Sequence, residues 1–198
     1  MNYYNRLTNR LVLTAAAALL AASPVSLLAA DETKPSEETH PPQLTPEQMK
    51  QADTDFLREA CSGGMLHVMA SKYALSQVKS PQVRKLAEML IEHHEKGLKT
   101  LADVAAKSGI ELPKELLPPQ RTMLDEAMTV KGEQFVAVYL INMTTLHVHD
   151  ILAFSNAAAK SKNKDISGFA SDTLPMLKKH LAEIKPMAAA EVELKEDI

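Results

Sequence analysis

Four long segments with helical periodicity constrain the fold of this chain more than any other feature of its sequence. They cover about 53–78, 81–108, 133–160 and 164–185, and in each one apolar residues return at alternating spacings of three and four. That spacing places their side chains along one face of an α-helix. No stretch shows the alternation of apolar and polar residues that half-buried strands have. The predicted fold class is all-α, and a four-helix bundle is the simplest way to bury four such faces.

The predicted helices begin and end at recognisable capping residues. Thr45 and Ser80 each precede a proline, a residue that suits the first position of a helix. Gln48 lies three residues after Thr45 and completes a capping box. We expect a first short turn here that leads into the 53–78 helix. Gly109 follows the second segment, where a residue in the left-handed conformation commonly ends a helix.

Prolines define the connections between the predicted helices. The stretch 110–120 holds three prolines and predicts a connection longer than a tight turn, followed by a short extra helix over about 121–128. A connection of this length can cross the bundle instead of joining neighbouring helices. In the last segment, Pro175 predicts a kink because it removes one backbone hydrogen bond, and Pro186 predicts the end of the helix.

Residues 1–30 have the features of a secretory signal peptide. Arg6 and Arg10 form a positive start, an apolar run over 11–22 follows, and the predicted cleavage lies near Ala30. The run is shorter than the roughly 20 residues that a membrane-spanning helix needs. We therefore expect an exported protein, periplasmic in a bacterium, with no transmembrane span in the mature chain. Association with the outer membrane stays open.

The rest of the chain divides into a leader, a domain and a tail. Residues 31–44 are rich in Pro, Glu and Thr and nearly lack apolar side chains, which predicts a flexible leader. Residues 45–188 form the predicted bundle domain, and residues 189–198 form an acidic tail. A formal net charge of −3 without a basic patch argues against nucleic acid as a partner. The single cysteine, Cys61, cannot form an intramolecular disulfide and is expected to be buried and inert.

Each long segment carries a histidine on its apolar face, and these histidines are the candidate metal ligands. They are His67, His94, His147 and His180. Inward positions at similar heights in a bundle come within reach of one another, which is how metal sites in helical bundles are built. Neutral imidazole suits zinc, copper and iron. His93 lies beside His94 but falls off the apolar stripe.

Methionines and carboxylates narrow the choice of metal. Met143 and Met176 each lie one helical turn before a candidate histidine, and Met89 lies one turn before His93. Thioether and imidazole together favour copper over iron. A di-iron centre of the usual bundle type needs Glu-x-x-His on two helices, and this chain has no such motif.

The same histidines also have a metal-free interpretation. Asp150 and Glu183 lie three residues after His147 and His180 respectively. These carboxylates either orient the imidazoles beside a metal or serve as structural hydrogen-bond partners. The ten methionines are equally compatible with filling gaps in the core. The residues therefore leave two interpretations open, a metal site and a hydrogen-bonded core.

Several motifs resemble the domain of unknown function 4142 family. The matching motifs are Asp55-Phe-Leu, Gly63-Gly-Met65, Leu90-Ile-Glu-His-His94, Leu146-His147 with Phe154 seven residues later, and Thr173-Leu-Pro-Met-Leu-Lys-Lys-His-Leu181. The last motif is the most specific, and the resemblance covers about 53–184.

The resemblance implies an exported bacterial protein with a ferritin-like helical bundle, a kind often labelled as a predicted outer membrane protein. His94, His147 and His180 match the characteristic histidines of the family. His67 departs from it, because the family usually has Glu there, and this change favours nitrogen ligands. The family has no settled activity, so the resemblance implies fold and export more than function.

The leading hypothesis is a ferritin-like bundle that binds a transition metal, with copper, zinc and iron as candidates. His147 and His180 are the first expected ligands, followed by His94 and His67. The role would be metal handling or stress protection in the cell envelope. The alternative is a metal-free structural or protein-interaction module of the periplasm. No catalytic set is identified, which argues against an enzyme, although a redox enzyme with a metal pair and inward carboxylates is a third hypothesis. Homo-oligomerisation stays open.

Overall fold

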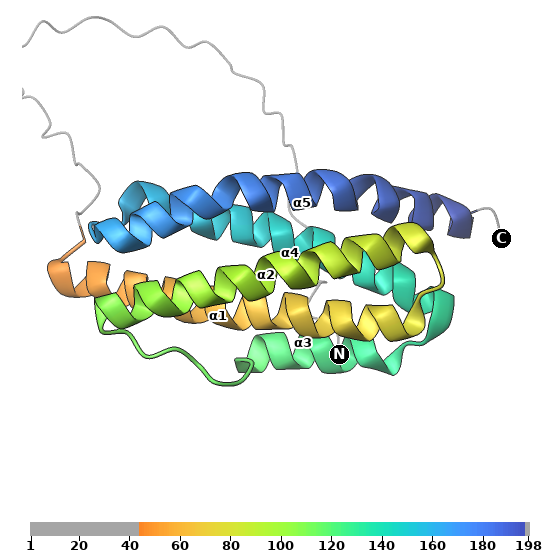
Figure 1. The fold of residues 1–198 in the computed structure, drawn as a ribbon, viewed down its shortest axis with the longest axis horizontal. Coiled ribbons are helices and arrows are strands. Elements are labelled where there is room, and N and C mark those ends of the chain that lie inside the picture. The colour runs from red at the N-terminus through yellow and green to blue at the C-terminus, as the bar shows by residue number, and fades with distance from the viewer. Residues whose placement is uncertain (1–43, 197–198) are drawn as a thin grey trace, which may run out of the picture. The chain divides into compact units, whose positions relative to one another are not determined.

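The computed structural model describes residues 44–196, and all the helices expected from the sequence are present in it. They are α1 (Pro46–Gln77), α2 (Pro81–Ser108), α3 (Pro118–Thr129), α4 (Gly132–Lys160) and α5 (Lys164–Glu196) (Figure 1). The described residues contain no strand, so the all-α prediction is confirmed. The predicted signal peptide 1–30, leader residues 31–43 and the last two residues of the predicted tail lie outside the described residues.

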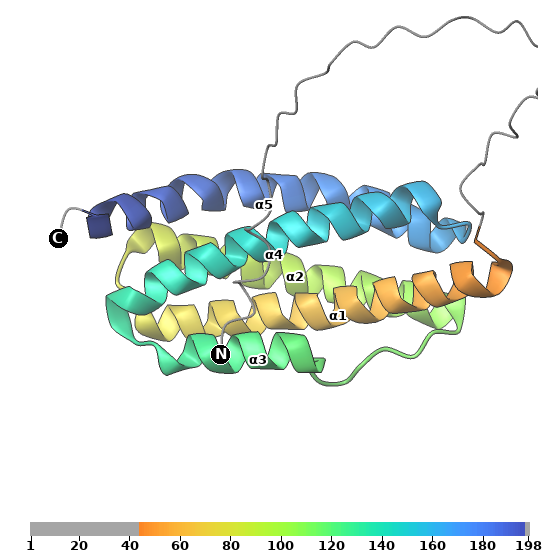
Figure 2. The same cartoon turned by 180° about the vertical axis from the view of Figure 1, so that it is seen from behind.

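The helices α1, α2, α4 and α5 form the predicted four-helix bundle. α1 and α5 each pack against both α2 and α4, and every packed pair of bundle helices is antiparallel (Figures 1 and 2). The short helix α3 packs on α1 and α4 from outside. Residues 109–131 carry the chain from α2 to the diagonally opposite α4, which confirms the predicted crossover. One long crossover of this kind is the connectivity of ferritin-like folds.

The predicted helix caps are present. The Thr45 N–H donates to Gln48 Oε1 (2.8 Å), and the Gln48 N–H donates to Thr45 Oγ1 (3.2 Å). The side chain of Ser80 caps α2, and Gly109 after it has a φ of 66°. One expectation was wrong, because the short turn and the 53–78 helix are a single helix from Pro46. The capping box satisfies the backbone N–H groups of Thr45 and Gln48, and no residue between Pro46 and residue 53 interrupts the helix.

Two other helix boundaries differ from the prediction. α3 begins at Pro118 and not at 121, since its first positions need no backbone N–H and accept proline. α5 continues past Pro186 to Glu196, so the predicted end at Pro186 was wrong and part of the predicted tail is helical. Ile184 and Ala188 on either side of this proline are buried in the core. That packing outweighs the one backbone hydrogen bond that proline removes.

The apolar core has two parts along the bundle. The Tyr139 cluster contains Leu66, Leu90, Leu140 and Ile184 among other buried residues. The Phe154 cluster contains Leu57, Leu101, Phe169 and Leu177 among others. Each of the four candidate histidines lies at the boundary between the two clusters on its own helix.

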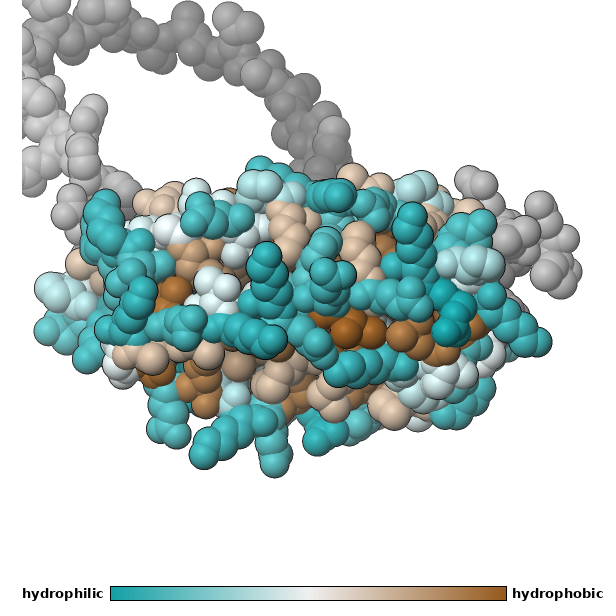
Figure 3. Space-filling view, viewed as in Figure 1, coloured by the Kyte–Doolittle hydropathy of each residue, from teal (hydrophilic) through white to brown (hydrophobic). Residues whose placement is uncertain are grey.

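α4 is the most apolar part of the described bundle. Among the described residues, one helical stretch is long and apolar enough to cross a membrane, Gln134–Lys160 within α4. A core helix passes the same test, and Tyr139 and Leu140 of α4 are buried. The other side of the helix exposes Ile141, Val148 and Leu152. On the face of the bundle seen in Figure 3, hydrophilic side chains dominate, with apolar side chains between them.

Candidate metal centre

The four histidines predicted as ligands meet in one buried layer, which we term the histidine layer. His67 on α1, His147 on α4 and His180 on α5 have no exposed surface, and His94 on α2 is 7% exposed. The ring centroid of His67 lies 4.1 Å from that of His94 and 4.6 Å from that of His147. The His147 and His180 centroids are 5.3 Å apart. Each bundle helix therefore contributes one imidazole to the same place.

Burial keeps these imidazoles neutral at physiological pH. Removal from water lowers the pKa of His67 to about 4, and it lowers the pKa values of His147 and His180 to about 3. The pKa of His94 is also lowered by burial, and the neighbouring histidines add to this effect. A positive charge on any one ring would repel a charge on the next. The neutral form is the one that binds metals.

Backbone carbonyls decide which nitrogen carries the proton in two of these rings. Nδ1 of His67 lies 2.8 Å from the carbonyl oxygen of Gly63, and Nδ1 of His147 lies 2.8 Å from that of Met143. A carbonyl oxygen only accepts hydrogen bonds, so Nδ1 of each ring is the donor. Nε2 of both His67 and His147 therefore carries a lone pair.

A series of hydrogen bonds runs from His147 to the edge of the bundle. Because Nε2 of His147 accepts, Nδ1 of His180, 3.2 Å away, donates to it. Nε2 of His180 then accepts from Nδ1 of His93 at 2.8 Å. The partly buried His93 ring stacks on His180 with centroids 5.1 Å apart. We term the series His93–His180–His147 the imidazole relay.

Two solvent-shielded ring nitrogens of the histidine layer have no hydrogen-bond partner among the described residues. They are Nε2 of His67 and Nε2 of His94, and both are shielded from solvent. Leaving a buried polar atom without a partner costs about 1–3 kcal/mol. A ring nitrogen from each of His67, His94 and His147 lies within 4.8 Å of the other two. The two unpartnered atoms thus belong to a group of three imidazoles that a single ion can bridge.

The geometry of the group shows how it must change to hold an ion. Zinc and copper bind imidazole nitrogen at about 2.0–2.1 Å. The rings of His67 and His94 are stacked with only 7° between their planes, so binding requires one of them to turn. His67 is held by Gly63, whereas no hydrogen bond among the described residues holds His94. His180, also predicted as a ligand, is not part of this group of three. Its Nδ1 donates to Nε2 of His147.

Asp150 has a different neighbour from the one its sequence position suggested. It follows His147 by three residues, but its Oδ2 lies 3.7 Å from Nε2 of His67. Burial raises the pKa of Asp150 to about 7, although His149 opposes the shift. Since the pKa of His67 is about 4, His67 is neutral near pH 7 and the contact is not an ion pair.

Other residues singled out in the sequence have clear places in the structure. Met176 lines a cavity of about 30 Å³ together with His94 and Asp150, which is room for a water molecule. Glu183 lies 4.0 Å from Lys179 and does not orient His180. Cys61 is buried as expected, and burial raises the pKa of its thiol.

His93 was not among the site residues predicted from the sequence. Its signal was the spacing from Met89, which pointed to His93, while the apolar stripe pointed to His94. The structure shows that both belong to the site, His94 in the group of three and His93 at the outer end of the relay.

A family model described as "Domain of unknown function (DUF4142)" matches residues 38–187 of the chain. No curated protein matches the chain.

Proposed function

The chain belongs to the DUF4142 family, whose description names no function, and we propose that it binds a transition metal through buried imidazoles. The observation that carries this proposal is the pair of unpartnered atoms, Nε2 of His67 and Nε2 of His94. They lie beside His147 in a group with nitrogens within 4.8 Å of one another. A metal ion would supply the missing interaction to both.

The ligands in this proposal are His67, His94 and His147. Three neutral nitrogen donors favour zinc or copper. Iron is less favoured because the usual iron sites of helical bundles are rich in carboxylates. Among the described residues, Asp150 is the one carboxylate within 4.0 Å of a nitrogen of the histidine layer. His180 is a positioning residue, since it donates to the nitrogen of His147 that a metal would use. A metal held at Nε2 of His147 would replace the hydrogen bond from Nδ1 of His180 and would require the relay to reorganise.

The biological role we propose is metal handling or stress protection in the bacterial envelope. The buried setting of the histidine layer suits holding an ion more than presenting it to a substrate. Export is supported by the apolar run over 11–22 with Arg6 and Arg10 before it. Mass spectrometry of the protein recovered from the periplasm tests this part, because the chain should begin near Asp31. An intact residue 1 would contradict it.

The alternative function is a metal-free structural or interaction module, and the imidazole relay favours it. The relay satisfies His93, His180 and His147 by hydrogen bonds alone. A water molecule in the 30 Å³ cavity would do the same for His94. Nε2 of His67 is then the one solvent-shielded nitrogen of the layer that lacks a partner among the described residues.

The test is a calorimetric titration of Zn²⁺ and Cu²⁺, with elemental analysis of the protein before and after chelation. We expect roughly one ion per chain and a higher melting temperature when the ion is bound. A His67→Leu/His94→Leu double variant should lose at least about 100-fold in affinity, because loss of partners outside the ligand set alone typically costs 10–100-fold.

The matched control is His149→Leu, which removes an exposed histidine of α4 near Asp150. Its metal affinity should equal that of the unchanged protein. Equal binding by the double variant, or loss of binding in the control, would rule out the buried site. No binding at all and a melt indifferent to chelation would establish the metal-free alternative.

A further inference from the structure

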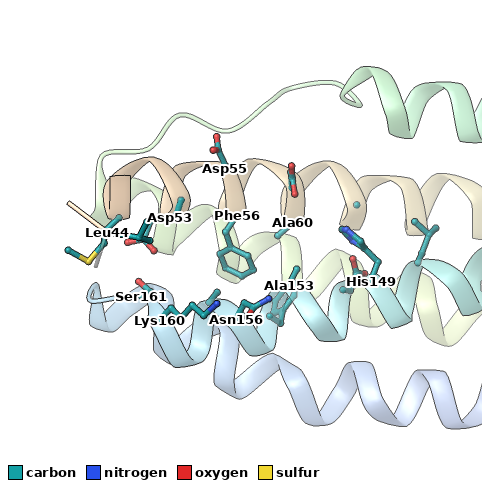
Figure 4. A pocket seen from close by; sticks show the side chains of 18 of the residues that line it. Leu44, Asp53, Asp55, Phe56, Ala60, His149, Ala153, Asn156, Lys160 and Ser161 are labelled. Carbon is teal, nitrogen blue, oxygen red and sulfur yellow. The ribbon is translucent and has the colours of Figure 1, made fainter. Parts of the chain in front are cut away.

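We infer that a second site on this protein binds small organic ammonium ions with an apolar body. The site is a pocket of about 290 Å³ between the first half of α1 and the second half of α4 (Figure 4). This size is near the lower end for small-molecule sites. No histidine of the histidine layer lines the pocket, so the inference does not depend on the metal proposal.

The walls of the pocket are mostly apolar. Phe56 and Ala60 point from α1 toward α4 (Figure 4), where Ala153, Phe154 and Ala157 complete the lining. The rings of Phe56 and Phe154 meet edge to face with centroids 5.0 Å apart. The small alanine side chains leave the space open, and the phenyl rings offer a surface for an apolar group.

Asp150 contributes a mostly buried carboxylate to the lining of this apolar space. Its side chain is 16% exposed, and its Oδ2 lies 3.7 Å from Nε2 of His67. A Cβ added to Gly63 would lie 3.8 Å from Asp150 Oδ1, so the glycine leaves that side of the carboxylate uncovered. A carboxylate that is largely withdrawn from water is unfavourable as an anion, and an ammonium group would compensate it.

The charges around the pocket also favour a cation. Asp53, Glu59 and Asp150 line it, against Lys160 and the exposed His149. Asp55 contributes less, because it points away from the pocket (Figure 4) and accepts a hydrogen bond from Gln51 at 2.8 Å. An apolar wall combined with net negative charge selects an apolar amine over a fatty acid or a phosphate.

Three probes of the same shape and different charge test the inference. They are 2-phenylethylammonium, 2-phenylethanol and 3-phenylpropionate, titrated by calorimetry at pH 8. We expect the ammonium ion to bind at least about tenfold more tightly than the alcohol, and the carboxylate to bind weakest. The titrations are repeated with chelator, which should leave the order unchanged. Equal affinities for the ammonium ion and the alcohol would overturn the inference.

Three variants locate the binding. Asp150→Asn keeps the shape and should remove the preference for the ammonium ion. Ala153→Leu fills the pocket and should abolish binding of the ammonium ion and of the alcohol, while metal uptake is retained. Asp172→Asn is the matched control, because it removes an exposed carboxylate of α5 that does not line the pocket, and it should change nothing. Ammonium binding that survives both Asp150→Asn and Ala153→Leu would contradict the inference.

Two other occupants give distinct results, and either would overturn the inference. If a second copy of the chain filled the pocket, the probes would not bind and Ala153→Leu would convert a dimer into a monomer. If residues 31–43 filled it, the probes would bind only after those residues were removed.

Discussion

Two regions in which the bundle buries polar side chains differ in whether the groups satisfy one another. In the Tyr139 cluster, the hydroxyls of Tyr139 and Ser71 form a hydrogen bond of 2.8 Å between two buried residues. In the histidine layer, Nε2 of His67 and Nε2 of His94 have no partner among the described residues. The first arrangement is complete within the fold. The second is incomplete, and an incomplete polar group in a core marks a place where something else can bind.

The largest expected difference between the two regions is in their response to acid. The pKa values of His67, His94, His147 and His180 are below the ordinary value of 6.5 in the folded protein. When the pH falls below 6.5, the unfolded chain takes up protons that the folded protein does not, so stability falls. Asp150 opposes this, because its raised pKa of about 7 lets the folded protein keep a proton that the unfolded chain releases above 3.8.

The net effect is an uptake of about three protons on unfolding, four from imidazoles less one from Asp150. Between about pH 6 and pH 5, the free energy of unfolding should fall by at most about 4 kcal/mol per pH unit. Urea denaturation at a series of pH values measures this slope. Tyr139→Phe should leave the slope unchanged, because burial raises the pKa of Tyr139 and moves it further from this range. A flat profile over this pH range would show that the layer is not held neutral.

A smaller effect is expected from truncating His147, the ring that belongs to both the group of three imidazoles and the imidazole relay. His147→Ala removes a fully buried ring and leaves Nδ1–H of His180 without its acceptor. We expect a loss of about 3 kcal/mol in metal-free protein at pH 7.5, from the cavity and the unpaired donor together. Chemical denaturation measures it. A loss below about 1 kcal/mol would mean that the relay contributes nothing to the fold.

The smallest and sharpest contrast comes from two substitutions that each remove one polar group. Tyr139→Phe should cost about 1–2 kcal/mol, because it leaves the buried Ser71 hydroxyl unpaired. His94→Leu should be neutral or stabilise metal-free protein by up to about 1 kcal/mol, because it removes an atom that has no partner. Thermal and chemical melts of the two variants, side by side, decide the point. Equal destabilisation would show that the two regions do not differ in the way described.

The fold and the four inward histidines could be predicted because they depend on the periodicity of single helices. Apolar spacing placed His67, His94, His147 and His180 on inner faces, and the caps at Thr45 and Ser80 located helix starts. Relations between helices could not be predicted in the same way. The spacing within α4 linked Asp150 to His147, whereas packing of α4 on α1 turns it toward His67. The predicted end of α5 at Pro186 was wrong, because core packing at Ala188 outweighed the loss of one backbone hydrogen bond at the proline.

The imidazole relay has one more consequence, which concerns how the buried layer can be observed. Each ring donates from Nδ1 toward the interior, and the last acceptor is the carbonyl oxygen of Met143, which has no proton to pass on. Reversing one ring alone would bring two donors or two acceptors face to face. The three rings therefore share one configuration. Nitrogen NMR signals of the partly exposed His93 should change when His147 Nε2 is occupied, so a ring at the edge of the bundle reports on an atom with no access to solvent.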